Sequence, residues 1–103
     1  MYFKNINEFV EHFKGMKNSH KIFDNYKRKS YKYIEWIFQY KDIKYFIKLE
    51  KNKYSIYYNE FYLPLSGNKK FSTYEGIEKY LISNTDIFNV LIRQKRIENI
   101  LKI

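Results

Sequence analysis

The chain has 103 residues, no cysteine and a formal net charge of +9, from 20 lysines and arginines against 11 aspartates and glutamates. This length predicts one compact domain over residues 1–103, and the lack of cysteine excludes disulfides, thiolate metal sites and cysteine nucleophiles. No apolar run approaches the roughly 20 residues that span a bilayer, and no secretory signal precedes the first helix. We therefore expect a protein without membrane contact, in the cytoplasm of a bacterial host cell.

The N-terminal quarter predicts helix. Asn5 suits an N-cap, and Glu8 follows three residues later, which is the spacing of a capping box. Gly15 predicts the end of this helix. A weaker helical spacing predicts a short second helix over about 19–28, closed by a basic connector. The core face of the first helix is predicted to consist of Ile6, Phe9, Val10 and Phe13.

The middle third predicts an antiparallel β-meander. Residues 31–40 and 43–50 alternate in polarity, and short turns at 41–42 and 51–53 join them to a third strand over 54–58. A fourth strand over 61–65 is expected at the sheet edge, because Pro64 cannot donate a ladder hydrogen bond. Residues 66–70 have the composition of a loop. The face expected to be buried carries Ile34, Trp36, Phe38, Tyr40, Ile43, Tyr45, Ile47 and Leu49.

Two helices are predicted to follow. Ser72 is expected to cap the first, with Glu75 in the capping-box position and Ile77, Tyr80 and Leu81 on its buried face. In the last helix Phe88 and Ile92 lie off the main apolar stripe, as a docking ridge or as a second core contact. The predicted stripe is Ile87, Val90, Leu91, Gln94, Ile97 and Leu101.

The predicted fold class is therefore α+β. It comprises an N-terminal helix or helix pair, a three- to four-stranded antiparallel β-meander, and two C-terminal helices packed on one sheet face.

Most catalytic signatures are missing, so no enzymatic activity is expected. His12 and His20 are eight residues apart, which is not the spacing of a helical metal pair, and no P-loop is present. The segment 42–44, with Glu35 upstream, resembles half of a metal-dependent nuclease motif, but Asp42 is better explained by turn formation. Glu75 and Glu78 fit first-turn positions that complement the helix dipole. We expect no metal and no cofactor.

Lysines interleaved with aromatic residues are the positive signal. Lysines neutralise phosphates and exposed rings stack on bases, so a sheet face that carries both suits nucleic acid. Tyr31 and Tyr33 are expected on the same face. AT-rich codon usage is an alternative explanation for the many lysines and tyrosines. The predicted nucleic-acid or partner-binding residues are Lys27, Arg28, Lys29, Lys32, Lys44, Phe46, Lys48, Lys51, Lys53, Tyr57, Lys69 and Lys70.

The order of one helix, three strands and one helix over about 31–82 resembles double-stranded RNA-binding domains and the arm domains of phage-type integrases, at the level of topology alone. Residues 72–75 depart from the basic run that begins the final helix of the RNA-binding domain, and no functional residue is carried over. Small size and missing catalytic motifs are also similar to phage or mobile-element proteins, including anti-CRISPR inhibitors.

Three functions follow as hypotheses. The first is a non-enzymatic accessory protein of phage or mobile-element type that binds nucleic acid or a nucleoprotein complex through the Lys/Tyr-rich sheet face. The second is an anti-CRISPR-like inhibitor that contacts a host nucleic-acid-processing complex by protein–protein interaction. The third is a metal-free ribonuclease toxin that depends on lysine, tyrosine and either His12 or His20.

Overall fold

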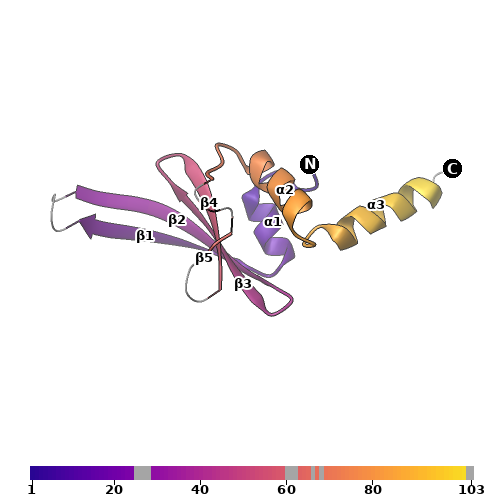
Figure 1. Ribbon diagram of the computed structural model, residues 1–103, viewed down its shortest axis with the longest axis horizontal. Coiled ribbons are helices and arrows are strands. Elements are labelled where there is room, and N and C mark those ends of the chain that lie inside the picture. Colours follow the sequence, from indigo (N-terminus) through magenta and orange to yellow (C-terminus); the bar gives the residue numbers. More distant parts are fainter. Residues whose placement is uncertain (25–28, 60–62, 66, 68, 102–103) are drawn as a thin grey trace.

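The computed structural model describes residues 1–24, 29–59, 63–65, 67 and 69–101, with the side chains of 21–24, 29–31 and 98–101 left out of the description. Within these ranges five strands form one antiparallel sheet in sequence order, β1 to β5 (Figure 1). The predicted α+β class is confirmed. The elements are α1 (Ile6–His12), β1 (Met16–Asp24), β2 (Lys29–Tyr40), β3 (Ile43–Glu50), β4 (Lys53–Tyr58), β5 (Leu63–Pro64), α2 (Tyr74–Asn84) and α3 (Asn89–Leu101).

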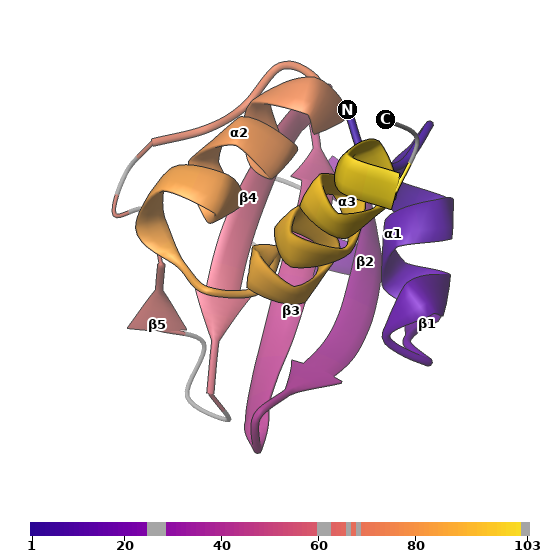
Figure 2. The same cartoon turned by 90° about the vertical axis from the view of Figure 1, so that its right-hand side faces the viewer.

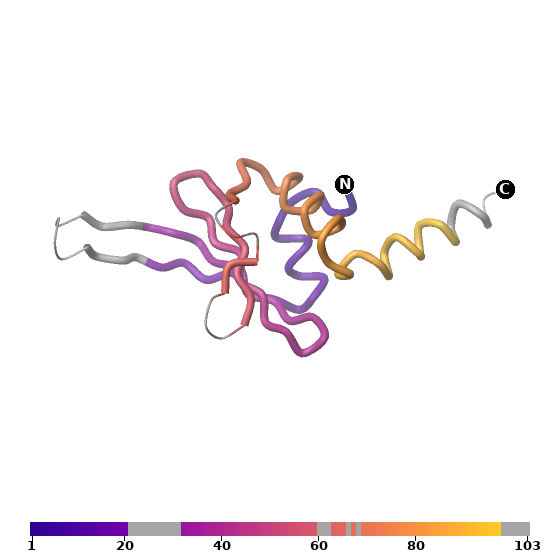
Figure 3. The backbone as a smooth tube through the Cα atoms, in the orientation of Figure 1, coloured from indigo at the N-terminus to yellow at the C-terminus, as the bar shows by residue number. Residues whose placement is uncertain are grey.

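The helices lie on one side of the sheet, and the other side carries none of the described helices (Figure 2). α1 and α2 cover the centre of the sheet, whereas α3 runs outward from it (Figure 1). The β1–β2 hairpin extends in the opposite direction, so the molecule is elongated, with a longest dimension of 62 Å (Figure 3).

Aromatic rings fill the space between the sheet and its helices. Phe9 of α1 is fully buried, stacks on Phe88 with ring centroids 5.5 Å apart, and meets Phe38 of β2 edge-on at 5.0 Å. Such ring pairs stabilise a core beyond the area that they bury. The sheet contributes Trp36, Phe38, Tyr45, Ile47 and Ile56 to the core. The rest of the chain contributes Ile6, Phe9, Val10, Phe71, Tyr74, Ile77, Leu81, Ile87 and Phe88.

Side-chain caps begin the first two helices. Asn5 Oδ1 accepts a hydrogen bond from the Glu8 backbone N–H at 3.0 Å, which confirms the predicted N-cap. The cap of α2 is Thr73, whose Oγ1 accepts from the Gly76 N–H at 3.2 Å. The prediction of Ser72 as this cap is wrong by one residue, because Ser72 instead contacts the Lys53 ammonium at 2.7 Å.

Two tight turns fix the register of the meander. Lys41 and Asp42 have φ angles of 47° and 64°, and Lys51 and Asn52 have 52° and 61°. Positive φ at both central residues is the type I′ geometry, whose twist matches that of antiparallel strands. The predicted turn at 41–42 is confirmed, and the predicted turn at 51–53 is one residue shorter.

The helix predicted over 19–28 is wrong across residues 19–24, which belong to β1. β1 pairs with β2 along its whole length, from Met16 opposite Ile37 to Asp24 opposite Lys29. The turn into β1 needs Gly15, since a Cβ there would stand 2.4 Å from the Ile37 carbonyl oxygen. Backbone pairing thus overrides the weak helical spacing of this segment. Residues 25–28 of that predicted helix lie outside the described part of the chain.

The sheet also has more strands than the three or four predicted. Pairing of Leu63 and Pro64 with β4 confirms a strand at the edge, as the proline required. Phe61 and Tyr62, part of the predicted edge strand, lie outside the described residues, as do Ser66 and Asn68 of the predicted loop.

The last helix departs most from its prediction. Val90 and Ile97, expected in the buried stripe, are 55% and 56% exposed. Phe88, expected off the stripe, is fully buried just before α3 begins, and Leu91 and Ile92 are partly buried against the core. The start of α3 therefore completes the core, while its remainder leaves the sheet uncovered.

The prediction of Glu78 as a first-turn residue is also wrong, because it lies beyond the first turn of α2 and is buried. Its carboxylate accepts hydrogen bonds from the Tyr74 hydroxyl at 2.6 Å and from the backbone N–H of Tyr2 at 2.5 Å. These bonds offset the cost of burying a charge. Burial, with this carboxylate beside it, holds the pKa of the Tyr74 hydroxyl well above its ordinary value. Glu78 thus ties the N-terminal segment to α2.

Candidate nucleic-acid interface

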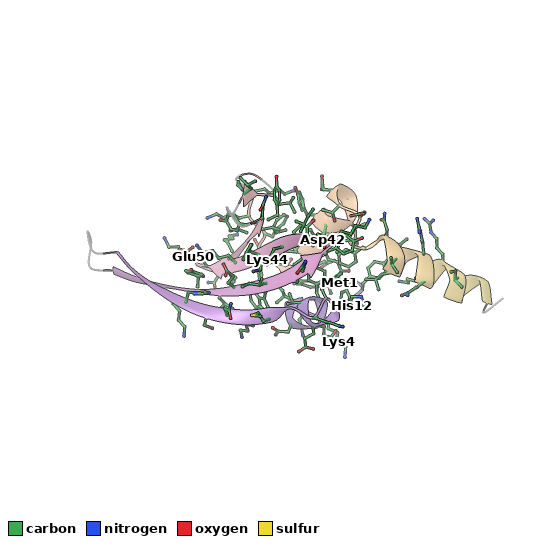
Figure 4. The ribbon with its side chains drawn as sticks, turned by 90° about the horizontal axis from the view of Figure 1, so that it is seen from below. Met1, Lys4, His12, Asp42, Lys44 and Glu50 are labelled. Carbon is green, nitrogen blue, oxygen red and sulfur yellow. The ribbon has the colours of Figure 1, made fainter. Side chains whose placement is uncertain are left out.

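We call the side of the sheet opposite the helices the helix-free face. Because successive side chains of a strand point to opposite sides, its residues alternate with the core residues. Figure 4 shows two of them, Lys44 and Glu50, near the two ends of β3. By this alternation the face comprises Met16, Asn18, His20, Tyr33, Glu35, Ile37, Gln39, Lys44, Phe46, Lys48, Glu50, Lys53, Ser55, Tyr57 and Pro64.

An apolar row crosses all five strands of the helix-free face. The strand register aligns Met16, Ile37, Phe46, Tyr57 and Pro64 side by side. Phe46 lies on the predicted face but is only 5% exposed, so its ring offers little surface for stacking on a base. Tyr57 is half-buried, and its ring is the one in this row with a partly accessible aromatic surface.

A polar cluster lies beside the apolar row. Glu35 is buried, and its carboxylate lies 3.6 Å from Nε2 of His20. The His20 ring stacks on Tyr33 with centroids 4.9 Å apart. In the described part of the chain the buried Nε2 of His20 has no hydrogen-bond partner.

Neighbouring groups partly neutralise the charge of Lys48. Its ammonium lies 4.3 Å from the centre of the Tyr33 ring and 3.1 Å from the Glu50 carboxylate. Lys48 is also opposite Glu35 in the strand register. The middle of the helix-free face is therefore close to charge balance, and its cationic character depends on the lysines nearer its edges.

Lys44, Lys53 and Lys70 are the exposed lysines at those edges. The Lys53 ammonium also donates a hydrogen bond to the Ser72 hydroxyl. Lys70 lines a hollow of about 440 Å³ beside β4 and β5. Lys51 is exposed in the turn between β3 and β4. The hollow is lined by Ser55, Tyr57, Pro64, Gly67, Lys69 and Lys70.

Several predicted site residues are not brought to this face. Lys32 is exposed but lies on the other side of β2, in alternation with Tyr33. Lys69 lines the hollow beside β4, but its ammonium lies 5.6 Å from the Phe71 ring and 5.8 Å from the Tyr80 ring, both on the helix side. Lys27 and Arg28 lie outside the described residues, and of Lys29 and Tyr31 only the backbone is described.

The possible nuclease motif is not assembled in the described ranges. Asp42 is exposed in its turn and lines a hollow of about 400 Å³ with Lys44 and Asn59, but Glu35 does not line it. The described residues contain no group of three or more carboxylates or histidines placed to hold a metal ion.

Sequence reasoning missed the contact between His20 and Glu35. The two residues are on neighbouring strands, and β1 was predicted as helix, which would place His20 elsewhere. The segment is polar from Lys17 to Lys21, so no alternation of polar and apolar side chains marked it as a strand.

An exposed ion pair partly neutralises one lysine near β2. The Lys41 ammonium and the Asp86 carboxylate are 2.5 Å apart. Their hydrogen bond lowers the pKa of Asp86 and raises the pKa of Lys41. Lys41 therefore links the β2–β3 turn to the segment that precedes α3.

Comparison with known proteins finds no family model, no curated protein and no solved structure that matches this chain. Among the described residues, no helix combines the length and the apolar character needed to cross a membrane. The function must therefore be argued from the geometry of the surface.

Proposed function

We propose that this protein is a non-enzymatic accessory protein of phage or mobile-element type that binds single-stranded nucleic acid, free or within a nucleoprotein complex, through its helix-free face. The supporting observation is that lysines at the edges of this face flank a row of aromatic and apolar side chains on neighbouring strands. Phosphates would contact Lys44, Lys53 and Lys70, and bases would stack against Tyr57 and His20.

A single strand fits this face better than a duplex. Bases of a single strand are free to stack on side chains, whereas a duplex hides their flat surfaces and offers grooves and phosphates. His20 lies on β1 and Tyr57 on β4, so an extended chain laid across the sheet could reach both rings.

The test is titration of labelled single- and double-stranded DNA and RNA at low and physiological salt. The variant Lys44→Glu/Lys53→Glu is compared with Lys4→Glu/Lys79→Glu, which changes the net charge equally on other surfaces. We expect the first to weaken binding at least about tenfold and to reduce the salt dependence, and the second to have a much smaller effect. Equal losses in both variants would show that the charge attracts polyanions without a site.

If neither nucleic acid binds at physiological salt, the protein-contact alternative of an anti-CRISPR-like inhibitor takes precedence. That function needs one cognate complex, so the deciding measurement is inhibition of a purified nucleic-acid-processing complex. The same paired charge variants then report whether the helix-free face makes the contact.

A second candidate is a metal-free ribonuclease, and the contact between His20 and Glu35 favours it. An imidazole beside a carboxylate can accept the proton of a ribose 2′-hydroxyl while the 2′-oxygen attacks the phosphate. A nearby ammonium such as Lys48 can stabilise the charge at the phosphate, and the leaving 5′-oxygen takes its proton from water. His12 is a poorer candidate, because it packs against Phe3 and Phe13 at α1.

The two candidates separate in one assay. RNA incubated with the protein in chelator should stay intact if the protein only binds. Cleavage that leaves a 2′,3′-cyclic phosphate and a 5′-hydroxyl, and that His20→Gln abolishes while His12→Gln does not, would establish the ribonuclease instead.

A further inference from the structure

α3 contacts the rest of the molecule through its first half. Leu91 and Ile92 pack against the core, and the Lys95 ammonium lies 5.3 Å from the Tyr2 ring. From there the helix runs away from the sheet (Figures 1 and 3). A helix of 13 residues is marginal in water without packing, so a covering partner would stabilise it.

One side of α3 exposes a narrow apolar stripe that begins in its first turn. Val90 and Ile97 are seven residues apart and so lie on the same side of the helix, with exposed Gln94 between them. This spacing of four and then three residues is that of a seam between two helices. A hollow of about 300 Å³ continues the surface at the base of α3, where Met1 is 70% exposed.

Positive charge borders the stripe. Along its 13 residues α3 carries Arg93, Lys95 and Arg96 against one carboxylate, Glu98, which follows the stripe in the sequence. All three side chains are exposed, and neither arginine forms an ion pair with a residue that the structure describes. A partner that covers the stripe would therefore gain from carboxylates along its edges.

We propose that α3, with the hollow beside its base, docks an acidic amphipathic helix of a partner protein. A second copy would set the same cationic helix against itself. Nucleic acid would pair with the arginines but leave Val90 and Ile97 in water. A membrane surface is best matched by a broad apolar face, and only a narrow one is exposed here.

This docking surface lies apart from the helix-free face and does not rest on the proposed nucleic-acid binding. The probe is a labelled three-heptad model peptide with leucine at its a and d positions and glutamate at its e and g positions. The same peptide with lysine at e and g is the charge control. Titration by fluorescence anisotropy compares both peptides with the full-length protein.

We expect the acidic peptide to bind and the basic peptide not to bind. The variant Val90→Ser/Ile97→Ser keeps every charge and should weaken binding by about tenfold or more. Arg93→Glu/Arg96→Glu should weaken it as well. The matched control Met16→Ser/Ile43→Ser removes two exposed apolar side chains from the sheet and should leave binding unchanged. Circular dichroism verifies that all variants remain folded.

Equal binding of the two peptides, or no effect of Val90→Ser/Ile97→Ser, would overturn the proposal. So would sedimentation that shows self-association lost in that variant, which would assign the surface to a second copy. Stronger α3-dependent binding to phosphatidylglycerol vesicles than to the acidic peptide would assign it to a membrane.

Discussion

The two faces of the sheet are made by alternate residues of the same strands, yet they differ in what they contribute. On the helix-covered face Ile47 and Ile56 are fully or almost fully buried in the core. On the helix-free face the neighbouring residues Lys48 and Ser55 remain partly accessible, and Glu35, His20 and Lys48 form a polar cluster. One face therefore holds most of the buried apolar side chains, while the other keeps several polar and charged side chains partly accessible to solvent.

The largest effect is expected on the covered face. Phe9→Ala should lower the free energy of unfolding by about 3–5 kcal/mol, because Phe9 contacts rings from β2, α2 and the approach to α3. Chemical denaturation monitored by Trp36 fluorescence measures the loss. A loss under about 1 kcal/mol would mean that these rings do not form the main core.

A substitution at Phe46 tests whether the helix-free face contributes less to stability than the helix-covered face. Phe46→Ala should lower the free energy of unfolding by about 2–3 kcal/mol, less than Phe9→Ala because its surroundings can relax toward solvent. The same denaturation experiment decides this. A loss as large as that of Phe9→Ala would show that the helix-free face carries an equal share of stability.

Tyr74→Phe should cost about 1–2 kcal/mol, because the variant loses a buried hydrogen bond to the Glu78 carboxylate. Burial and Glu78 raise the pKa of Tyr74 above its ordinary 10.0, so the folded chain keeps a proton that the unfolded chain loses. This contribution is complete below pH 10 and falls as the pH rises further.

Unfolding curves measured from pH 8 to pH 11 should therefore show stability declining above pH 10, less steeply in Tyr74→Phe. Some decline should remain in the variant, because burial also raises the pKa of Tyr45. Identical slopes for the two proteins would contradict the role assigned to Tyr74.

Lys48→Met should have the smallest effect on stability, below about 1 kcal/mol. It removes a partly exposed ion pair with Glu50 but keeps the apolar stem over Tyr33. Binding of single-stranded RNA should nevertheless weaken. A large stability loss without a change in binding would place Lys48 among the structural residues and narrow the proposed interface.

Sequence patterns were most informative where local chemistry and tertiary contacts agree. Asn5 caps α1 as predicted, and the alternation from Ile34 to Leu49 identified the buried face of β2 and β3. The predictions fail where the local pattern and the tertiary contacts disagree. β1 has a weak helical spacing but pairs along β2, and the spacing of α2 itself places Glu78 with Tyr74, Ile77 and Leu81 on the buried face.

The interface residues divide in the same way. Period-two alternation placed Lys44, Lys48, Lys53 and Tyr57 on one side of the sheet, and the structure agrees. Alternation tells on which side of the sheet a side chain lies, but not how far side chains on the same side cover it. It therefore could not reveal that Phe46 is nearly inaccessible or that Lys48 is paired with Glu50.

The sequence by itself determined the α+β class, the two tight turns, the meander and the strong positive charge, because each depends on residues close together in the chain. Only the tertiary structure decided that β1 joins the sheet, that Glu78 holds the N-terminal segment and that α3 projects with Val90 and Ile97 exposed. Those features depend on contacts between distant segments. A helical pattern specifies which side chains share a face, but not which surface that face meets.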